Sequence, residues 1–133
     1  MRKLPAPLAA LALAACANQP ADPGAATAAS NSRVPLATPI GQPQTCIPLP
    51  VRESRVRSDQ VIDFIATGRR TYRVTLPQRC PGLGFERSVT YATSLDRLCA
   101  QDIITVLNQG GGPQRGASCG LAPFQPVTLA TRR

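Results

Sequence analysis

The sequence predicts a mainly β protein: a small single-domain β-barrel or sandwich of about six short antiparallel strands, stapled by two disulfides. Three observations favour this fold class. Apolar and polar residues alternate with a period of two, turn-forming residues recur roughly every ten positions, and four cysteines follow residue 45. Because a domain of about 84 residues buries only a little over 60 % of its chain surface, we expect covalent cross-links to supplement its core.

The expected strands are rich in β-branched and aromatic residues and are bounded by turn-forming residues. They cover Ile47 to Val51, Val61 to Ala66, Thr71 to Leu76, Ser88 to Thr93, Ile103 to Leu107 and Pro126 to Leu129. No segment shows a sustained helical pattern, and we expect at most one helical turn, over Ser94 to Cys99. The glycines of Gly110 to Pro113 predict a flexible connection, since the Lys-Ser/Thr end of a phosphate-binding loop is missing.

The clearest local prediction is a hairpin with a three-residue loop, Thr67-Gly68-Arg69. This loop places Phe64 opposite Tyr72 and Ile62 opposite Val74, which makes one face apolar. On the other face the same register sets Asp63 against Arg73. A slip by one residue would destroy both pairings, so the sequence pattern selects this register.

The cysteines Cys46, Cys80, Cys99 and Cys119 form an even set in a chain expected to be exported, which predicts two disulfides with three possible connectivities. We favour Cys80 with Cys99 and Cys46 with Cys119, because the second bond would tie the start of the domain to its end. Spacings of 34, 19 and 20 residues do not match the paired knuckles of zinc ribbons. The chain also contains no Cys-x-x-Cys motif, the pattern that would indicate redox catalysis.

The first fifteen residues have the features of a signal peptide. Arg2 and Lys3 precede an apolar run from Leu4 to Ala15, which is too short to cross a hydrocarbon layer of about 30 Å as a helix. The stretch that ends this run, Leu13-Ala14-Ala15-Cys16, resembles the lipobox of bacterial lipoproteins. The resemblance implies cleavage before Cys16, lipidation of Cys16, and the periplasmic face of the outer membrane as destination. Stable anchoring requires two or more acyl chains.

Residues 16–45 predict a lipidated cysteine and a disordered tether, because Ala, Pro, Thr, Ser, Asn and Gln dominate and no aromatic residue occurs. A disulfide-stabilised β domain is expected over 46–129, with a short tail at 130–133. The alternative for Cys16 is an ordinary secretory signal that contains an incidental cysteine.

The charge is carried by arginine. Fifteen basic and seven acidic residues give a formal charge of +8, and loss of Arg2 and Lys3 with the leader leaves +6, with every remaining basic residue an arginine. The guanidinium fork matches carboxylate and phosphate groups. The candidate anion-binding residues are Arg55, Arg57, Arg69 and Arg70. The alternative is a solubilising face on which Asp63 neutralises Arg73.

Catalytic chemistry finds little support. The chain has no histidine, and no lysine follows the leader, which excludes Ser-His-Asp, Schiff-base and Ser-Lys mechanisms. The carboxylates available are Asp22, Glu53, Asp59, Asp63, Glu86, Asp96 and Asp102. Asp59 lies in a Ser-Asp turn, and Asp102 is expected to accept backbone hydrogen bonds in a turn. We therefore assign no catalytic residue, metal ligand or cofactor.

Several motifs of the domain resemble an uncharacterised family of small four-cysteine proteobacterial exported proteins. They are Cys46-Ile47-Pro48-Leu49, Tyr72-Arg73, Leu76-Pro77, Cys80-Pro81-Gly82-Leu83, Leu98-Cys99 with Asp102 and Ile104, and Cys119 with Phe124 and Pro126-Val127. The resemblance covers about the last 84 residues. It implies a proteobacterial envelope and supports two disulfides, and it carries no activity to transfer.

These observations predict a membrane-anchored envelope lipoprotein that acts as a non-catalytic binding or scaffolding module. Its expected partners are the membrane, through the lipid anchor, and an anionic envelope component or a protein, whereas nucleic acid is not expected in this compartment. Two alternatives stay open. One is an envelope hydrolase that uses carboxylates, with Asp102 as its candidate, and the other is an inhibitor that presents the Cys80 to Gly84 loop to such a hydrolase.

Overall fold

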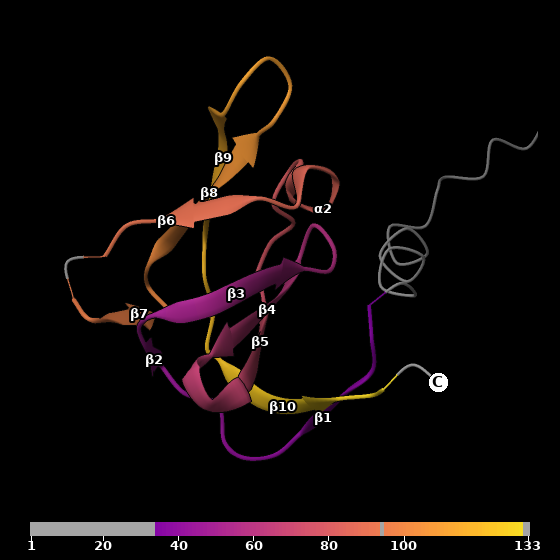
Figure 1. Ribbon diagram of the computed structural model, residues 1–133, viewed down its shortest axis with the longest axis vertical. Helices are drawn as coiled ribbons and strands as arrows, with labels where there is room; N and C mark the ends of the chain where they lie inside the picture. Colours follow the sequence, from indigo (N-terminus) through magenta and orange to yellow (C-terminus); the bar gives the residue numbers. More distant parts are fainter. Residues whose placement is uncertain (1–33, 94, 132–133) are drawn as a thin grey trace, which may run out of the picture.

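The structure is a computed structural model that describes residues 34–93 and 95–131. Its largest element is a five-stranded antiparallel sheet in the order β1-β10-β5-β4-β3 (Figure 1). The interior strand β4, between β5 and β3, is buried along nearly its whole length, because it packs on the core with one face and holds Asp63 on the other. The strands are β1 (Ala37–Pro39), β3 (Val51–Val56), β4 (Val61–Ala66), β5 (Thr71–Thr75) and β10 (Gln125–Leu129).

Two smaller antiparallel sheets complete the described part of the chain. A two-stranded sheet joins β2 to β7, and a three-stranded sheet has the order β6-β8-β9. One short helix, α2 (Leu83–Glu86), precedes β6, and the 3-10 turn η1 (Thr67–Arg69) joins β4 to β5. The bounds of the strands are β2 (Cys46–Pro48), β6 (Val89–Tyr91), β7 (Arg97–Cys99), β8 (Ile103–Asn108) and β9 (Gln114–Gly120).

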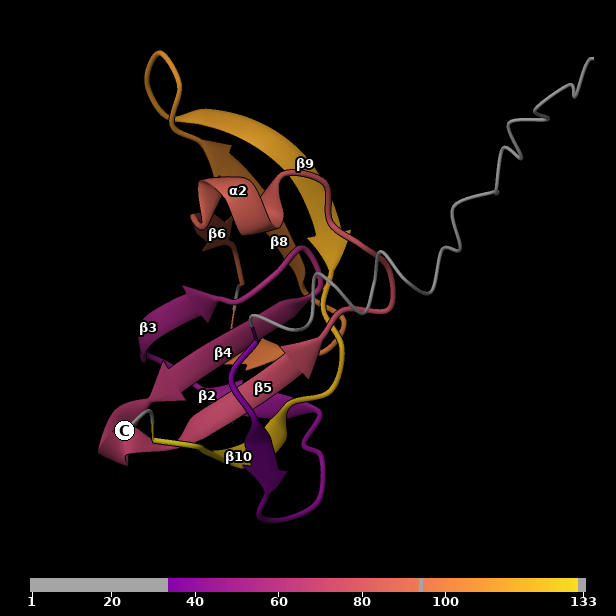
Figure 2. The same ribbon diagram turned by 90° about the vertical axis from the view of Figure 1, so that its right-hand side faces the viewer.

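The elements are distributed along the long axis of the molecule. In two views at right angles, η1 lies with β1 and β10 toward one end, and α2 lies with the β8–β9 hairpin toward the other (Figures 1 and 2). The core is shared between the sheets, with side chains such as Phe64, Val106 and Phe124 fully buried in one cluster. All of these residues and both disulfides lie within the described residues.

The predicted fold class is confirmed in its main features, namely a mainly β chain, antiparallel pairing and two disulfides. Two details differ. The described residues form ten strands rather than six, and their sheets stay open, so the fold is not a closed barrel. Within the same residues, no helix is long and apolar enough to cross a bilayer.

The predicted hairpin is confirmed residue by residue. Ile62 pairs with Val74, Asp63 with Arg73, and Phe64 with Tyr72. Ala66 donates its N–H to the carbonyl of Arg70 at 2.8 Å, which closes the three-residue loop. The alternation of apolar and charged residues therefore determined the register, as expected for a strand pair with one buried face.

Three predictions about local structure are wrong. Ser94 to Cys99 was expected to make a helical turn, but β7 occupies its last three residues and pairs with β2. No strand was expected between Leu107 and Pro126, but β9 begins at Gln114 and pairs with β8. In addition, the strand expected from Ile47 to Val51 is divided between β2 and β3. Pairing with a neighbour supplies the stabilisation that the polar residues of β9 lack on their own.

The folded unit also begins earlier than predicted. The tether was expected to extend to Thr45, yet Ala37 to Pro39 form β1 and pair with Leu129 to Val127 of β10. Main-chain hydrogen bonds order this proline-rich segment without requiring buried side chains, and proline is tolerated on such an edge strand. The leader, Cys16 and the tether up to residue 33 lie outside the described residues.

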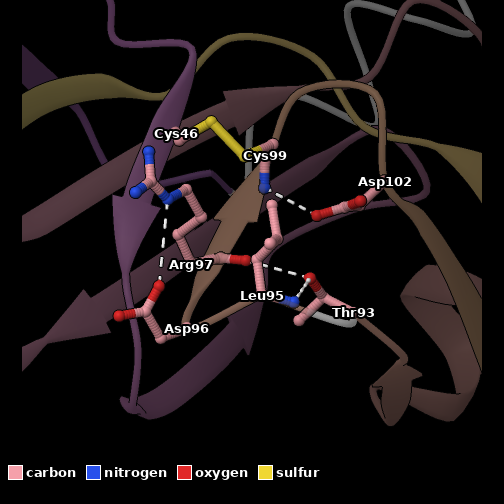
Figure 3. The surroundings of a disulfide bond; sticks show 7 residues. All are labelled: Cys46, Thr93, Leu95, Asp96, Arg97, Cys99 and Asp102. Atoms are coloured by element: carbon pink, nitrogen blue, oxygen red, sulfur yellow. Dashed lines mark hydrogen bonds and ion pairs between the residues drawn. A yellow bond between two sulfur atoms is a disulfide. The ribbon is translucent and has the colours of Figure 1, made fainter.

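The disulfide pairing corrects the favoured connectivity. The bonds join Cys46 to Cys99 and Cys80 to Cys119, not Cys80 to Cys99 and Cys46 to Cys119. The first bond links directly opposite residues of β2 and β7. Figure 3 shows it beside Asp102, which accepts the N–H of Cys99 at 2.7 Å. The missed strand β7 therefore explains the error, because it is the element that brings Cys99 to Cys46.

Candidate functional site

A cavity of about 520 Å³ opens between the tip of the β4–β5 hairpin, the end of β10 and the loop that follows β1. It is called the arginine cavity below, because Arg69 and Arg70 both line it. Its lining combines these two cations with amide, hydroxyl and apolar groups. The lining residues are Ile40, Gly41, Gln42, Gln44, Arg69, Arg70, Thr71, Tyr72, Pro126, Val127, Thr128 and Leu129.

The arginine cavity exists because β10 changes its partner. Gln125 to Val127 pair with β5, and that ladder stops at the pair Val127 and Thr71. Beyond Val127, β10 continues only alongside β1, while the chain on the β5 side turns into the hairpin loop. The two strands therefore diverge, and the space between them is the cavity.

The hairpin loop places the two arginines on one wall. Gly68 and Arg69 both have a positive φ, 77° and 62°, which is the backbone conformation of tight hairpin turns. Such a φ is uncommon for a residue with a side chain. Arg70 returns to extended backbone, so consecutive guanidinium groups leave the turn at the cavity. Both residues are exposed, and neither has an ion-pair partner among the residues that the structure describes.

The opposite wall is held by hydrogen bonds from the segment 124–126. The N–H of Ile40 donates to the carbonyl of Pro126 at 3.0 Å, and Gln44 and Phe124 exchange two main-chain bonds of 2.8 Å. The side-chain amide of Gln125 donates to the carbonyl of Gly41, also at 2.8 Å. These bonds fix the loop in place, so the cavity is formed before any ligand arrives, as is usual for binding sites.

The other two candidate anion-binding residues are committed to protein partners. Arg57 donates through Nε to Asp63 Oδ2 at 2.7 Å, and Arg55 donates to both carboxylate oxygens of Glu53 at 2.7 and 2.9 Å. The structure therefore separates the four predicted residues. It brings Arg69 and Arg70 together at a cavity, and it uses Arg55 and Arg57 on β3 and just after it.

Asp63 is the centre of a buried ion cluster. Its side chain has 0 % exposure and lies between Arg57 and Arg73. Arg73 reaches both of its oxygens, at 2.7 and 3.0 Å, and also donates to the carbonyl of Pro35 at 2.8 Å. The sequence pattern predicted the pair of Asp63 and Arg73 but not the contact of Asp63 with Arg57, because that contact depends on the pairing of β3 with β4.

Three further carboxylates of the described residues, Asp59, Glu86 and Asp102, also have structural partners. Glu86 accepts the N–H of Gln109 at 2.9 Å, and Asp102 caps the turn before β8 as predicted. Within residues 34–93 and 95–131, no group of three or more His, Cys, Asp or Glu side chains could hold a metal ion. The predicted turn residue Asp59 has a larger role than expected, because it receives bonds from both Arg79 and Gly84.

These contacts make the stability contribution of Asp59 dependent on pH. Burial alone would raise the pKa of Asp59, but the hydrogen bonds from Arg79 and the Gly84 N–H, with the charge of Arg79, outweigh it, so the pKa lies below its usual value. A lowered pKa in the folded state stabilises the protein above the unfolded pKa of about 3.9, and this contribution is lost as the pH falls through the folded value.

We therefore expect Asp59→Asn to lower the free energy of unfolding at neutral pH, and the difference from the wild type to shrink as the pH falls below about 4. Urea denaturation at a series of pH values measures it. Asp96→Asn is the control, since the Asp96 side chain is 94 % exposed and its contact with Arg97 is 3.9 Å long. A difference for Asp59→Asn that is constant from neutral to acidic pH would contradict the assignment.

Comparisons of the chain with protein-family models, with curated proteins and with solved structures give no match. The site is therefore interpreted from its own geometry. The arginine cavity offers two guanidinium groups on one wall, amides on the other and apolar side chains between them. This arrangement suits an anionic group attached to a neutral or apolar body.

Proposed function

We propose that the protein is an envelope lipoprotein, anchored through Cys16 at the periplasmic face of the outer membrane, that binds an anionic envelope component in the arginine cavity. The observation that carries the proposal is the contrast among the four candidate arginines. Arg55 and Arg57 are held by carboxylates, whereas Arg69 and Arg70 line a preformed cavity. Cations at a cavity with fixed walls favour binding over solubility as their role.

The ligand is a carboxylate or a phosphate, because the guanidinium fork pairs with either group through two parallel hydrogen bonds. Apolar residues such as Ile40, Val127 and Leu129 line the same space. They favour a ligand whose charge sits at one end of a larger body over a free inorganic ion. Gln42 and Gln44 add amide groups that can bond to neutral polar parts of that body.

The proposed location in the cell envelope rests on the lipobox and on the disulfides. Two disulfides support a chain that matures in an oxidising compartment. The carboxylates give the alternative of catalysis no such support, since Asp102 is engaged by the N–H of Cys99. The alternative of an inhibitor gains little from the loop that begins at Cys80, because its end belongs to α2. An extended backbone is what a substrate-like inhibitor would present.

Binding at the arginine cavity is tested by calorimetric titration of the protein without its leader. The probes are inorganic phosphate, acetyl-Ala-Ala and its amide, which lacks the carboxylate. We expect the acid to bind more tightly than the amide. The variant with Arg69→Asn and Arg70→Gln should bind the acid at least about tenfold more weakly, because it loses charge-assisted hydrogen bonds. Asparagine is chosen at position 69 because it tolerates a positive φ.

The matched control is Arg55→Gln, which removes an arginine whose side chain is 47 % exposed but which pairs with Glu53 away from the cavity. It should bind all three probes as the wild type does. If neither phosphate nor the acid binds, or if the double variant binds as tightly as the wild type, the proposed ligand site is wrong.

The anchor is tested separately by intact-mass measurement of the protein purified from membranes. We expect a chain that begins at Cys16 and carries acyl groups, and a Cys16→Ser variant that is not acylated. A mass that includes Met1 and no acyl group would refute the anchor while leaving the arginine cavity untouched.

A further inference from the structure

The end of the molecule that carries α2 presents an isolated aromatic side chain. Phe85 is 87 % exposed. The other two phenylalanines of the chain, Phe64 and Phe124, are fully buried and pack edge to face with ring centroids 5.8 Å apart. An exposed phenylalanine leaves most of its apolar surface in contact with water. A contact with another body would bury that surface.

The backbone that bears Phe85 is held in place by contacts of the segment that precedes it. Leu83 is fully buried in the core, and the Cys80–Cys119 disulfide joins the start of the loop to β9. The N–H of Cys80 also donates to the carbonyl of Asp59 at 2.7 Å. The aromatic ring therefore projects from a base that is tied to the core, to β9 and to the turn between β3 and β4.

The residues on either side of Phe85 are clamped as well. The N–H of Gly84 donates to Asp59 Oδ1 at 2.7 Å, and a Cβ at position 84 would lie 2.9 Å from that oxygen. Only glycine allows this approach. On the other side, Glu86 accepts the N–H of Gln109 at 2.9 Å. The position of Phe85 is thus set before any contact, which lowers the entropy lost on binding.

An exposed positive charge follows Phe85 along the chain. Asp59 is paired with Arg79, and Glu86 is engaged by a main-chain N–H. Arg87, which directly follows α2, is exposed. An aromatic side chain with an exposed arginine two positions along the chain favours a surface that has both apolar depth and negative charge.

We propose that Phe85 docks the domain onto the anionic bilayer in which Cys16 is anchored. Seventeen residues separate Cys16 from Val34, and even fully extended they reach no farther than about 60 Å. The bilayer is therefore the one surface always within reach of the domain, at an effective concentration of the order of millimolar. A single aromatic side chain and one arginine are enough to dock at that concentration.

Docking at Phe85 gives the domain an orientation. Arg69 of η1 lines the arginine cavity, and η1 lies toward the opposite end of the long axis from α2 (Figures 1 and 2). With Phe85 at the headgroups, the arginine cavity faces away from the anchoring membrane. This inference rests on the membrane address of the proposed function, and it does not depend on which anion the cavity binds.

The test uses the fact that the chain contains no tryptophan. In the protein without its leader and with Cys16 replaced by serine, Phe85→Trp supplies a single fluorescent indole at the docking position. The probe is vesicles of phosphatidylethanolamine and phosphatidylglycerol in a ratio of about three to one. A docked aromatic side chain inserts at the boundary between the headgroups and the acyl chains, where water is scarce. We expect the emission to shift to shorter wavelength on addition of these vesicles. Leu36→Trp, at a site that is 81 % exposed near β1, should not shift.

Affinity is measured by sedimentation of the same vesicles. Phe85→Ala should lower the partition coefficient about tenfold, and Arg87→Asn about fivefold, whereas Leu36→Ala should stay within twofold of the wild type. Phosphatidylcholine vesicles should bind more weakly. The proposal is wrong if the wild type does not bind the anionic vesicles, if Phe85→Ala binds as the wild type does, or if both tryptophans shift equally. None of these outcomes bears on the titration of the arginine cavity or on the mass of the anchor.

Discussion

Asp63→Asn is expected to lower the free energy of unfolding by about 3 kcal/mol, because it leaves two arginines in a low-dielectric site without their counter-charge. Arg57 and Arg73 have side-chain exposures of only 21 % and 14 %, so water compensates little. The amide that replaces the carboxylate keeps its shape, but its NH2 group faces N–H donors. Arg73 would also lose the support that lets it hold the carbonyl of Pro35, so the segment before β1 should loosen.

Urea denaturation followed by circular dichroism measures this effect. The control is Glu53→Gln, which breaks the ion pair with Arg55 at a site where both side chains are about half exposed. Exposed pairs contribute at most about 1 kcal/mol, so this variant should resemble the wild type. An Asp63→Asn variant within 1 kcal/mol of Glu53→Gln would show that the buried cluster does not stabilise the fold in the manner described.

Loss of either disulfide is expected to cost about 4 kcal/mol on the chain-entropy model. The bonds close loops with sequence separations of 53 and 39 residues, which makes the two costs similar. Each is comparable to the whole stability of a small domain. The paired variants Cys46→Ala with Cys99→Ala and Cys80→Ala with Cys119→Ala should therefore be marginally folded, and reduction of both bonds should unfold the domain.

Non-reducing peptide mapping tests the connectivity directly. We expect linked peptides that contain Cys46 with Cys99 and Cys80 with Cys119, and unfolding curves of the two paired variants that shift to lower urea by similar amounts. A linked peptide that joins Cys80 to Cys99 would contradict the structure. A paired variant as stable as the wild type would contradict the energetic argument.

The hairpin could be predicted because its information is local. The apolar alternation of Ile62 and Phe64, the glycine of the turn and the charge pair of Asp63 with Arg73 all lie within a few residues of one another, and they agree on one register. The same kind of information is missing for β1, β7 and β9. These segments are polar, short or proline-rich, and they become strands only because a neighbouring strand offers hydrogen bonds.

The disulfide connectivity shows the same limit. The number of cysteines and the expected compartment predicted two bonds, but the partners depend on which strands pair. Cys99 was placed in a helical turn, so its position opposite Cys46 could not be foreseen. The pairing of β2 with β7 and the approach of β9 to the base of α2 decide the outcome, and both are long-range contacts.

The candidate site was predicted in part. All four arginines were selected for their charge, and the two at the hairpin tip are those that the structure places at a cavity. Glu53 pairs with Arg55 within β3, and Asp63 of β4 pairs with Arg57 just after β3. No sequence pattern indicated that β3 and β4 are neighbours. The cavity itself had no sequence signal, because it results from the divergence of β10 from β5. The exposure of Phe85 could not be predicted from the sequence either, since an apolar residue close to a buried leucine is usually assigned to the core.

The short edge strand β1 connects directly to the loop that forms one wall of the arginine cavity. Tension transmitted from an anchored N-terminus enters the fold at Val34, passes the hydrogen bond between Pro35 and Arg73, and then loads β1 and its three pairs with β10. The next segment along the chain is Ile40 to Gln44. If the N-terminus is anchored and the arginine cavity is occupied as proposed, a load on the chain and the bound anion act on one continuous stretch of backbone, so a force that separates β1 from β10 would also release the anion.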